Sequence, residues 1–391
     1  MAARIEEELL DYASYETAFA DLSMGQQRAN QIVLRIASIA SMCGSGYTVW
    51  NLLGPQRQNE LYTNLFSRLL FGLCLADFLA SAALFMGSWP IPQDSFHMPN
   101  LVWNVGNQIT CTVQGFFLQT FYIASIFYTA SISVNFLLCV KYQWTEDQLR
   151  QRVEIYLHAV SWLVPVTLSI LCLIFDLYNP TAFFCYVATY PIGCDHNDNV
   201  PCLRGDHIGL WRSVAQLVPF GVCLSTVVYC MTRIYFTIRA HELAVAQHSD
   251  TWVAQTATDS LLAMKKAAQY IGLLVVVWTP VLIVTLCQDL GRKIPFWIWL
   301  MDASLMPIVG LLNSIVYTRF INPVETVTNS VSTIQNKGTQ VLQFVRSSFG
   351  SSSAEMRSAS QASATIIEVD QSSARINNAS FTIDERFKEA E

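Results

Sequence analysis

Charged residues are scarce in this sequence. Only 13% of its 391 residues are Asp, Glu, Lys or Arg, which is about half the share found in a typical soluble domain. Hydrophobic residues make up 52%, and the mean hydropathy is +0.35. The shortage of charge falls in long apolar runs, so the chain belongs among integral membrane proteins. Its basic residues form no stripe, which excludes a nucleic-acid partner.

Two further absences limit the function. The first ten residues, MAARIEEELL, are acidic where a signal peptide would be basic, so we expect the first apolar run to direct its own insertion. Histidine is also rare, since only six are present. Only His158 lies in an apolar run, and no pair of histidines has the spacing of metal ligands. The sequence therefore argues against an enzyme, and we expect neither a metal nor another cofactor.

Seven apolar runs are long enough to cross a bilayer, which needs about 20 mostly apolar residues. They are 31–53, 64–87, 109–140, 155–177, 208–236, 264–287 and 296–320. We therefore predict an all-α membrane protein built as a seven-transmembrane helix bundle. The last run contains no Lys between 296 and 318, which excludes the retinal Schiff base of a light-driven pump.

The flanking regions complete the predicted organisation. Residues 1–30 precede the domain at 31–320. Residues 321–346 begin with Asn322 and Pro323, typical of a helix start, and predict a short amphipathic helix on the membrane surface. The polar, Ser-rich tail at 347–391 is expected to be disordered. Its serines are candidates for phosphorylation and for kinase- or arrestin-type contacts, and a merely solvated tail is the alternative.

Lys and Arg are unevenly distributed between the two sets of loops. One side carries Arg57, Arg68, Lys141, Arg150, Arg152, Arg233, Arg239, Lys265, Lys266 and Arg319. Because cytoplasmic loops are enriched in basic residues, this pattern predicts an extracellular N-terminus and a cytoplasmic C-terminus. We expect the plasma membrane as the location.

One acidic residue lies in the middle of a span. Asp77 falls within FGLCLADFLASAALF, where a carboxylate costs about 2.5–3.5 kcal/mol on insertion scales. It should therefore face the bundle interior and have polar partners. We interpret it as the charge centre of a conformational switch that binds a cation or a proton, and a protonated packing residue is the alternative.

Polar residues mark one face of the third span. The residues that recur at three- and four-residue steps are Gln114, Leu118, Gln119, Tyr122, Ser125 and Thr129. Gln114 and Gln119 lie in its outer half and Ser125 near its middle. Asp302 lies toward the outer end of the seventh span.

The sixth and seventh spans carry a second group of candidate switch residues. Trp278 precedes Pro280 by two residues, and a proline inside a helix makes a kink, which is either static or a moving hinge. Asn313 and Tyr317 are four residues apart and share one face close to the inner end of the seventh span.

Four cysteines lie on the predicted outer side. A bond between Cys111 and Cys185 would tie the loop at 178–207 to the third span and leave Cys194 and Cys202 to pair. The sequence itself leaves the connectivity open.

With these residues the chain resembles seven-transmembrane G-protein-coupled receptors over roughly 31–325. Its rhodopsin-like marks are Leu75-Ala76-Asp77, Cys111, Trp162, Trp278-x-Pro280 and Asn313-x-x-x-Tyr317. The stretches SMCGSG, HAVSWLVPVTLSIL and FFCYVATY are more similar to the cyclic-AMP-receptor-like group. The rhodopsin-like resemblance implies a sodium site formed by Asp77 and Ser125, with Asn313 and Trp278 beside it.

The sequence departs from the rhodopsin-like pattern at several positions. The inner end of the third span reads Ser133-Val134-Asn135, without the Asp/Glu-Arg-Tyr triplet that meets the G protein. Ser41 and Ser45 lie where an Asn is expected, and Ser314 replaces the usual Pro. Leu118 occupies the position at which amine receptors have an Asp, which argues against an amine ligand.

The resemblance leads to a functional hypothesis. We expect an extracellular ligand to bind between the outer halves of spans three, five, six and seven, and span six to swing about Pro280. The candidates for ligand contact are Gln114, Gln119, Tyr122 and Asp302. Those for contact with a heterotrimeric G protein are Lys141, Arg150, Arg239, Lys265 and Lys266, whose charges are also accounted for by topology alone.

The alternative hypothesis is a small-solute or ion transporter or channel. Several intramembrane charges lining a path would favour it, and so would an internal repeat. The sequence shows no repeat, and its central charges reduce to Asp77 and the more peripheral Asp302.

Overall fold

The computed structural model divides the chain into two units, residues 1–318 and 319–391. It describes residues 22–55, 58–95, 101–191, 194–196, 201–246, 272, 275–290 and 292–316, all in the first unit. Several predictions fall outside these residues: the amphipathic helix at 321–346, the tail at 347–391, and the roles of Tyr317, Lys265 and Lys266.

Within the described residues, five helices are long and apolar enough to cross a membrane. They are α2 (Met24–Leu53), α4 (Leu65–Phe85), α5 (Gln108–Lys141), α7 (Glu154–Ile174) and a continuous helix over Ile208–Ala240. This last helix is made of α8 (Ile208–Arg212), a π-helical turn (Ser213–Leu217) and the first part of α9 (Val218–Ala246).

The two remaining predicted runs are also helical. A shorter apolar helix occupies Val275–Asp289. The last run forms a bent pair, α11 (Phe296–Leu305) followed by Val309–Val316, with an angle of 48° between them. The break contains Pro307, which has no backbone N–H to donate to the preceding turn. The sequence predicted a single continuous span here, so the bend is a feature that the apolar pattern did not reveal.

The first helix begins at Met24, before the predicted start at 31. Ser23 caps it, because its hydroxyl accepts from the Gln26 amide at 3.3 Å while the Gln26 side chain accepts from the Ser23 amide at 2.9 Å. The added turns contain Gln27 and Asn30, which are polar but buried. Hydropathy alone therefore placed the start of the helix too late.

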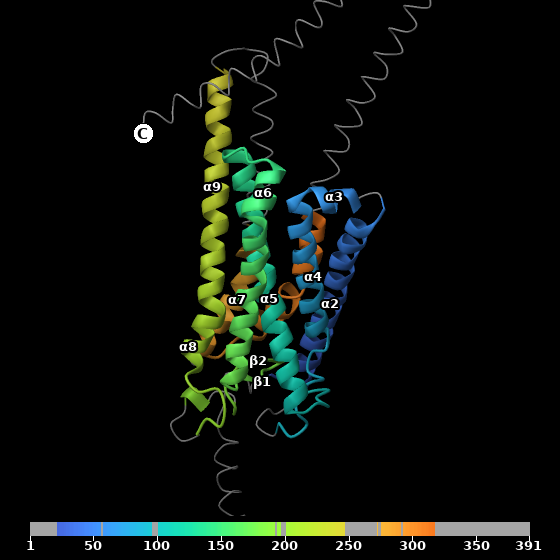
Figure 1. Ribbon diagram of the computed structural model, residues 1–391. Coiled ribbons are helices and arrows are strands. Elements are labelled where there is room, and N and C mark those ends of the chain that lie inside the picture. The colour runs from blue at the N-terminus through green and yellow to red at the C-terminus, as the bar shows by residue number, and fades with distance from the viewer. Residues whose placement is uncertain are drawn as a thin grey trace, which may run out of the picture. The chain divides into compact units, whose positions relative to one another are not determined.

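Helix α5 is the centre of the bundle. It packs against α4, α7 and α9, while α2 packs against α4 and α11 (Figure 1). Close contact between α2 and the last span depends on Gly44, because a Cβ there would lie 2.7 Å from the Cα of Leu311. Small residues at such crossings let helix backbones approach each other in membranes.

The two ends of the bundle have different connections. At one end, α3 (Gln58–Thr63) and α6 (Glu146–Arg152) lie near the ends of the spans (Figure 1). There Arg68 of α4 pairs with Glu154 of α7 at 2.6 Å. The other end, called here the disulfide end, carries a small antiparallel sheet of β1 (Tyr178–Pro180) and β2 (Cys185–Val187), and the turn η1 (Cys194–His196). This hairpin was not predicted from the sequence.

Candidate functional site

The mid-span acid Asp77 joins three helices. It lies on α4 with 4% of its surface exposed. The hydroxyl of Ser125 on α5 donates to Asp77 Oδ1 at 2.5 Å, and the amide of Asn313 in the last span donates to Oδ2 at 2.8 Å. Both carboxylate oxygens therefore have a donor, as a buried acid requires. The resemblance grouped these three residues with Trp278, whose ring instead contacts Tyr122 and Phe220.

A layer of hydroxyl groups surrounds this carboxylate. The Ser81 hydroxyl donates to Ser41 Oγ at 2.9 Å, and the Gly310 amide donates to the same Ser41 oxygen at 3.0 Å. A Cβ at Gly310 would overlap the side chains of Ser41 and Ser45. Ser41, which departs from the rhodopsin-like pattern, therefore bonds α2 to α4 and to the last span, whereas the Ser45 hydroxyl donates to the Ser41 backbone oxygen within α2.

Ser314 also has a structural partner. Its hydroxyl accepts a hydrogen bond from Thr48 of α2 at 2.7 Å. A proline, which the rhodopsin-like pattern has here, could not accept a side-chain hydrogen bond. The contact of α2 with the last span thus extends from Ser41 to Thr48.

Trp278 lies in an aromatic stack near the centre of the bundle. Its ring is 4.4 Å from that of Phe220 and 4.9 Å from that of Tyr122, measured between centroids. Pro280 follows within the same helix, Val275–Asp289. The ring of Trp278 therefore connects this helix to α5 and α9.

A small cavity lies against this stack. Its volume is about 20 Å³, room for about one water molecule. The residues around it are Tyr122, Ile123, Tyr186, Gln216, Leu217, Phe220, Trp278, Val281, Leu282, Thr285 and Met306. The residues around the cavity therefore belong to α5, to β2, and to the fifth, sixth and last spans.

Several buried polar atoms near the disulfide end have no hydrogen-bond partner among the described residues. They belong to Tyr122 (Oη), Gln119 (Oε1), Asp302 (Oδ1), Gln27 (Oε1) and Asn30 (both amide atoms). Such groups are rare in folded proteins, and each calls for an explanation such as a water or a ligand. The network around Asp77, in contrast, is fully bonded.

Tyr122 connects the two regions. Its side chain lines the small cavity and contacts the ring of Trp278, and its hydroxyl is one of the atoms without a partner. Gln119, one turn away on α5, donates to the backbone oxygen of Ala215 at 2.9 Å but keeps its own oxygen free. Three of the four predicted ligand-contact residues therefore present unused polar atoms.

The fourth, Gln114, is fully used within the protein. Its amide donates to the backbone oxygens of Ala83 at 3.0 Å and Gly87 at 2.9 Å, and its oxygen accepts from the Cys185 amide at 2.8 Å. Gln114 thus bonds α5 to α4 and to the β-hairpin. The structure gives it a positioning role beside the site.

The β-hairpin covers the bundle at the disulfide end. Phe183 at its tip is 2% exposed, and its ring lies 5.1 Å from that of Trp299. Gln31 of α2 donates to the Phe183 backbone oxygen at 2.7 Å. Burial raises the pKa of the Tyr186 hydroxyl, with Cys172 adding to the effect, so Tyr186 remains neutral. The hairpin, called here the lid, therefore packs against α2 and the last span at the disulfide end, and Tyr186 lies with Tyr122 beside the small cavity.

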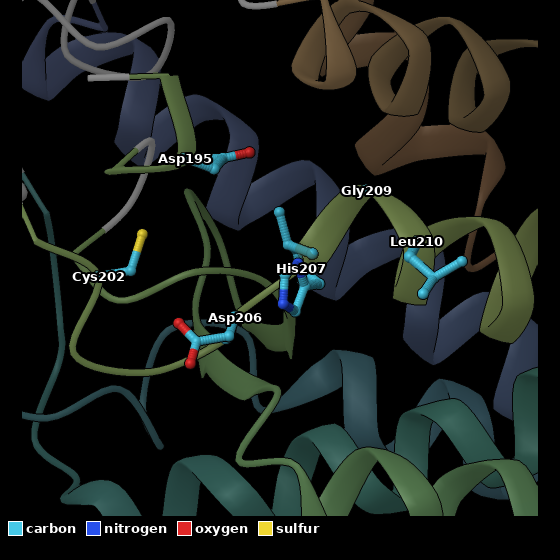
Figure 2. Close-up of a pocket in the computed structure, with 8 residues that line it drawn as sticks. Asp195, Cys202, Asp206, His207, Gly209 and Leu210 are labelled. Carbon is cyan, nitrogen blue, oxygen red and sulfur yellow. The ribbon is translucent and has the colours of Figure 1, made fainter. Parts of the chain in front are cut away.

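Two disulfides fix the loops at this end. Cys111 bonds Cys185, which ties the lid to the start of α5, and Cys194 bonds Cys202. Beside the second bond is an open surface pocket of about 430 Å³, lined by Asp195, Cys202 and residues 205–210 (Figure 2). Figure 2 shows Asp206 and His207 at this pocket. Its lining is separate from the cavity beside Trp278.

The predicted G-protein contacts that the structure describes lie at the end opposite the disulfides. Lys141 ends α5, and its ammonium group lies over the ring of Tyr142. Arg150 is exposed on α6, and Arg239 is exposed on α9. In place of an Asp/Glu-Arg-Tyr triplet, Ser133 and Asn135 are buried, and Ser133 donates to the Thr129 backbone oxygen at 3.0 Å.

Comparison with solved structures identifies the fold. The chain superposes on squid rhodopsin with a TM-score of 0.56, covering 78% of this chain and 79% of that one at 14% sequence identity. The chain therefore has a rhodopsin-type seven-helix fold. It is an integral membrane protein, and its resemblance to seven-transmembrane receptors is confirmed at the level of the fold.

Sequence comparison gives a second, shorter match. Over 81 residues the chain is 28% identical to latrophilin receptor-like protein A of Dictyostelium discoideum. That match covers 21% of this chain and 26% of the relative, so the chain spans about a quarter of the length of the curated protein it matches. No family model matches the chain. Neither comparison points to an enzyme or a transporter, and neither singles out the cyclic-AMP-receptor-like group.

Proposed function

We propose that this protein is a G-protein-coupled receptor of the plasma membrane, with the disulfide end outside the cell. The observation that carries the proposal is the contrast between the two halves of the bundle. The network around Asp77 is fully bonded, while Tyr122, Gln119 and Asp302 keep unused polar atoms near the disulfide end. Buried polar atoms that have no partner, next to a bonded network that joins several helices, favour a switch controlled by a ligand.

The chemistry of the site restricts the ligand. Carboxylate and amide oxygens only accept hydrogen bonds, whereas the Tyr122 hydroxyl can donate or accept. The free atoms of Asp302 and Gln119 thus favour a small extracellular ligand that donates hydrogen bonds. The cavity beside Trp278 is too small to hold more than about one water, so ligand entry must displace side chains of the stack.

This displacement supplies a mechanism for signalling. A ligand shifts a two-state protein only by binding one state more tightly. A ligand that separates Tyr122 from Trp278 would favour the state in which helix Val275–Asp289 has rotated about Pro280. The opposite end of the bundle would then open toward a heterotrimeric G protein. Lys141, Arg150 and Arg239 would form part of the contact, together with Lys265 and Lys266 outside the described residues.

The coupling mechanism differs from that of rhodopsin-like receptors, because the usual Arg is absent from the inner end of α5. The basic residues proposed above would have to supply the charge that it gives elsewhere. Contacts of the tail with kinase- or arrestin-type proteins are a further part of the proposal, based on its serines.

A nucleotide-exchange assay tests the proposal. The purified full-length chain in lipid nanodiscs is mixed with each class of heterotrimeric G protein, and binding of a non-hydrolysable GTP analogue is measured. A panel of small compounds that donate hydrogen bonds through hydroxyl or amide groups serves as ligand probes. We expect exchange above that of empty nanodiscs for at least one class. Folded protein that stimulates no class, under any probe, contradicts the proposal.

The transporter alternative is tested with the same preparation. The chain is reconstituted in sealed vesicles, and the flux of the same compounds is followed. Flux that depends on the protein, in the absence of nucleotide exchange, would replace the receptor proposal by the transporter hypothesis.

A further inference from the structure

A groove runs along the surface of the bundle between α4 and α5 at the disulfide end. Its volume is about 510 Å³, within the range of roughly 300–1,000 Å³ typical of small-molecule sites. The lining is almost entirely apolar: Leu79, Ala82, Ala83, Met86, Trp89, Pro90, Ile109, Thr110, Val113, Gln114, Phe117 and Phe121. The groove is separate from the cavity beside Trp278.

The two polar side chains in the lining are already bonded. The Thr110 hydroxyl donates to the Pro90 backbone oxygen at 2.8 Å. Gln114 has all its donors and its acceptor engaged, as described above. The polar side chains of the lining therefore have no free group for a polar ligand. Ile109 and Val113 on its rim are 75% and 49% exposed, so hydrocarbon is the chemistry that suits the groove.

The length of the groove matches one leaflet of the bilayer. Along α5 it extends from Ile109 to Phe121, which is about 18 Å at the rise of an α-helix. Half of the hydrocarbon core of a membrane is about 15 Å. Because α4 and α5 both cross the membrane, the exposed rim meets lipid, and a single acyl chain can follow the whole groove.

A cation contacts two residues of the groove. The guanidinium of Arg35 on α2 is 4.6 Å from the ring centroid of Trp89 and 4.8 Å from that of Trp103. It also donates to the Met86 backbone oxygen at 3.4 Å. Met86 and Trp89 are themselves part of the lining. The charge and the apolar groove therefore share two residues.

Arg35 has donor capacity left. None of the ion pairs found among the described residues includes it, and among its nitrogens only Nη2 donates to a described residue, at Met86. A guanidinium presents five N–H donors in a planar fork that suits phosphate oxygens. Stacking on two indole rings holds this fork in place, and such cation–π contacts leave its edge free for an anion.

We propose that the groove binds one glycerophospholipid of the leaflet at the disulfide end. One acyl chain lies along α4 and α5, and the phosphate accepts hydrogen bonds from Arg35. Each part of this lipid has a matching feature in the protein. The apolar groove suits the acyl chain, and the guanidinium stacked on the two indole rings suits the phosphate. A sterol would fill the groove but would leave the guanidinium without a phosphate.

Native mass spectrometry of the full-length protein, released from nanodiscs of phosphatidylcholine, tests this site. We expect one phospholipid to remain bound to the wild type. Arg35→Gln should reduce its retention by about five- to tenfold, the value of one interfacial Arg contact. The matched control is Arg28→Gln, which removes an exposed Arg of the same helix, and it should retain the lipid like the wild type.

A second pair of variants tests the groove itself and does not depend on the fold tolerating the loss of Arg35. Val113→Trp fills the groove and should abolish retention. Val160→Trp places the same side chain at a residue of α7 that is 46% exposed and outside the groove, and it should have no effect. Both pairs are compared at equal melting temperature and helix content.

Lipids of different chemistry separate the phosphate from the chain. Diacylglycerol with the same acyl chains lacks the phosphate, so its retention should be weak and unchanged by Arg35→Gln. Equal retention in Arg35→Gln and Arg28→Gln would overturn the proposal. So would strong retention of diacylglycerol by the wild type, or displacement of the phospholipid by an equimolar sterol.

Discussion

The amide of Asn313 donates a hydrogen bond to Asp77 Oδ2 at 2.8 Å, and so connects the last span to α4 through a single carboxylate. Ser125 reaches the other oxygen from α5. Next to them, Ser41 of α2 accepts hydrogen bonds from the Ser81 hydroxyl of α4 and from the Gly310 amide of the last span. Four spans therefore meet around one buried acid, and a change of its charge should alter the contacts among all four.

The Asp77→Asn variant tests the role of this charge. Asn has the same shape, so we expect normal insertion and expression. It has no charge, however, and its own amide would face the donor of Asn313, so basal or probe-driven nucleotide exchange should change. Asp176→Asn is the control, because Asp176 is an exposed loop acid paired with Arg204. Exchange by well-expressed Asp77→Asn that equals the wild type would remove Asp77 from the switch.

Removing the unpaired hydroxyl of Tyr122 and removing the bonded hydroxyl of Tyr128 should have opposite effects on stability. Tyr122→Phe deletes a buried hydroxyl that has no partner and should stabilise the ligand-free protein by about 1 kcal/mol. It should also weaken responses to probes that bind beneath the lid. Tyr128→Phe, on the same helix, deletes a hydroxyl that is bonded to His158 at 3.1 Å and should destabilise by about 1 kcal/mol.

Thermal melts followed by tryptophan fluorescence measure both changes. If Tyr122→Phe lowers the melting temperature as much as Tyr128→Phe does, the Tyr122 hydroxyl has a structural partner, and the proposed ligand site loses its main support.

Two glycines of α2 form a matched pair for helix packing. A Cβ on Gly44 would lie 2.7 Å from the Cα of Leu311, while one on Gly46 would lie 3.7 Å from the ring of Phe78, an ordinary contact. Gly44→Ala should therefore cost about 1–3 kcal/mol of stability by overpacking. Gly46→Ala should be neutral or slightly stabilising, since Ala is the better helix former. Equal melting temperatures for the two variants would mean that α2 does not pack on the last span as described.

The disulfides should contribute unequally to stability. The Cys111–Cys185 bond joins residues 74 apart in sequence, and the Cys194–Cys202 bond joins residues 8 apart. A longer closed loop restricts the unfolded chain more, and the first bond also anchors the lid. Replacing Cys111 and Cys185 by Ser should lower the melting temperature and the probe response more than replacing Cys194 and Cys202. The reverse order would show that the lid is held mainly by contacts such as that of Gln31.

Hydropathy was sufficient to predict the seven helices, because each span must bury about 20 apolar residues in lipid. It could not predict the earlier start of α2, where Gln27 and Asn30 are buried by neighbouring helices, or the bend at Pro307. Such features depend on which helix lies alongside, and that information is not carried by the periodicity of one segment.

The candidate site was also predicted only in part. The structure brings Asp77, Ser125 and Asn313 together, as the resemblance implied, while the sodium site itself stays a prediction. The partners of Ser41 and Ser314 were missed, because a serine within an apolar helix gives no sign of what it faces. Gln114 was expected at the ligand, but it supports the lid, and its bonds to Ala83 and Cys185 depend on chain segments distant in sequence.

The receptor account requires an odd number of spans, because the N-terminus must lie on the side of the lid and the C-terminus on the side of the basic inner residues. Epitope tags on the two termini of the full-length chain, probed in intact and in permeabilised cells, measure this directly. We predict that the N-terminal tag is accessible in intact cells and that the C-terminal tag is accessible only after permeabilisation. Detection of both tags in intact cells, or of neither, would contradict the account.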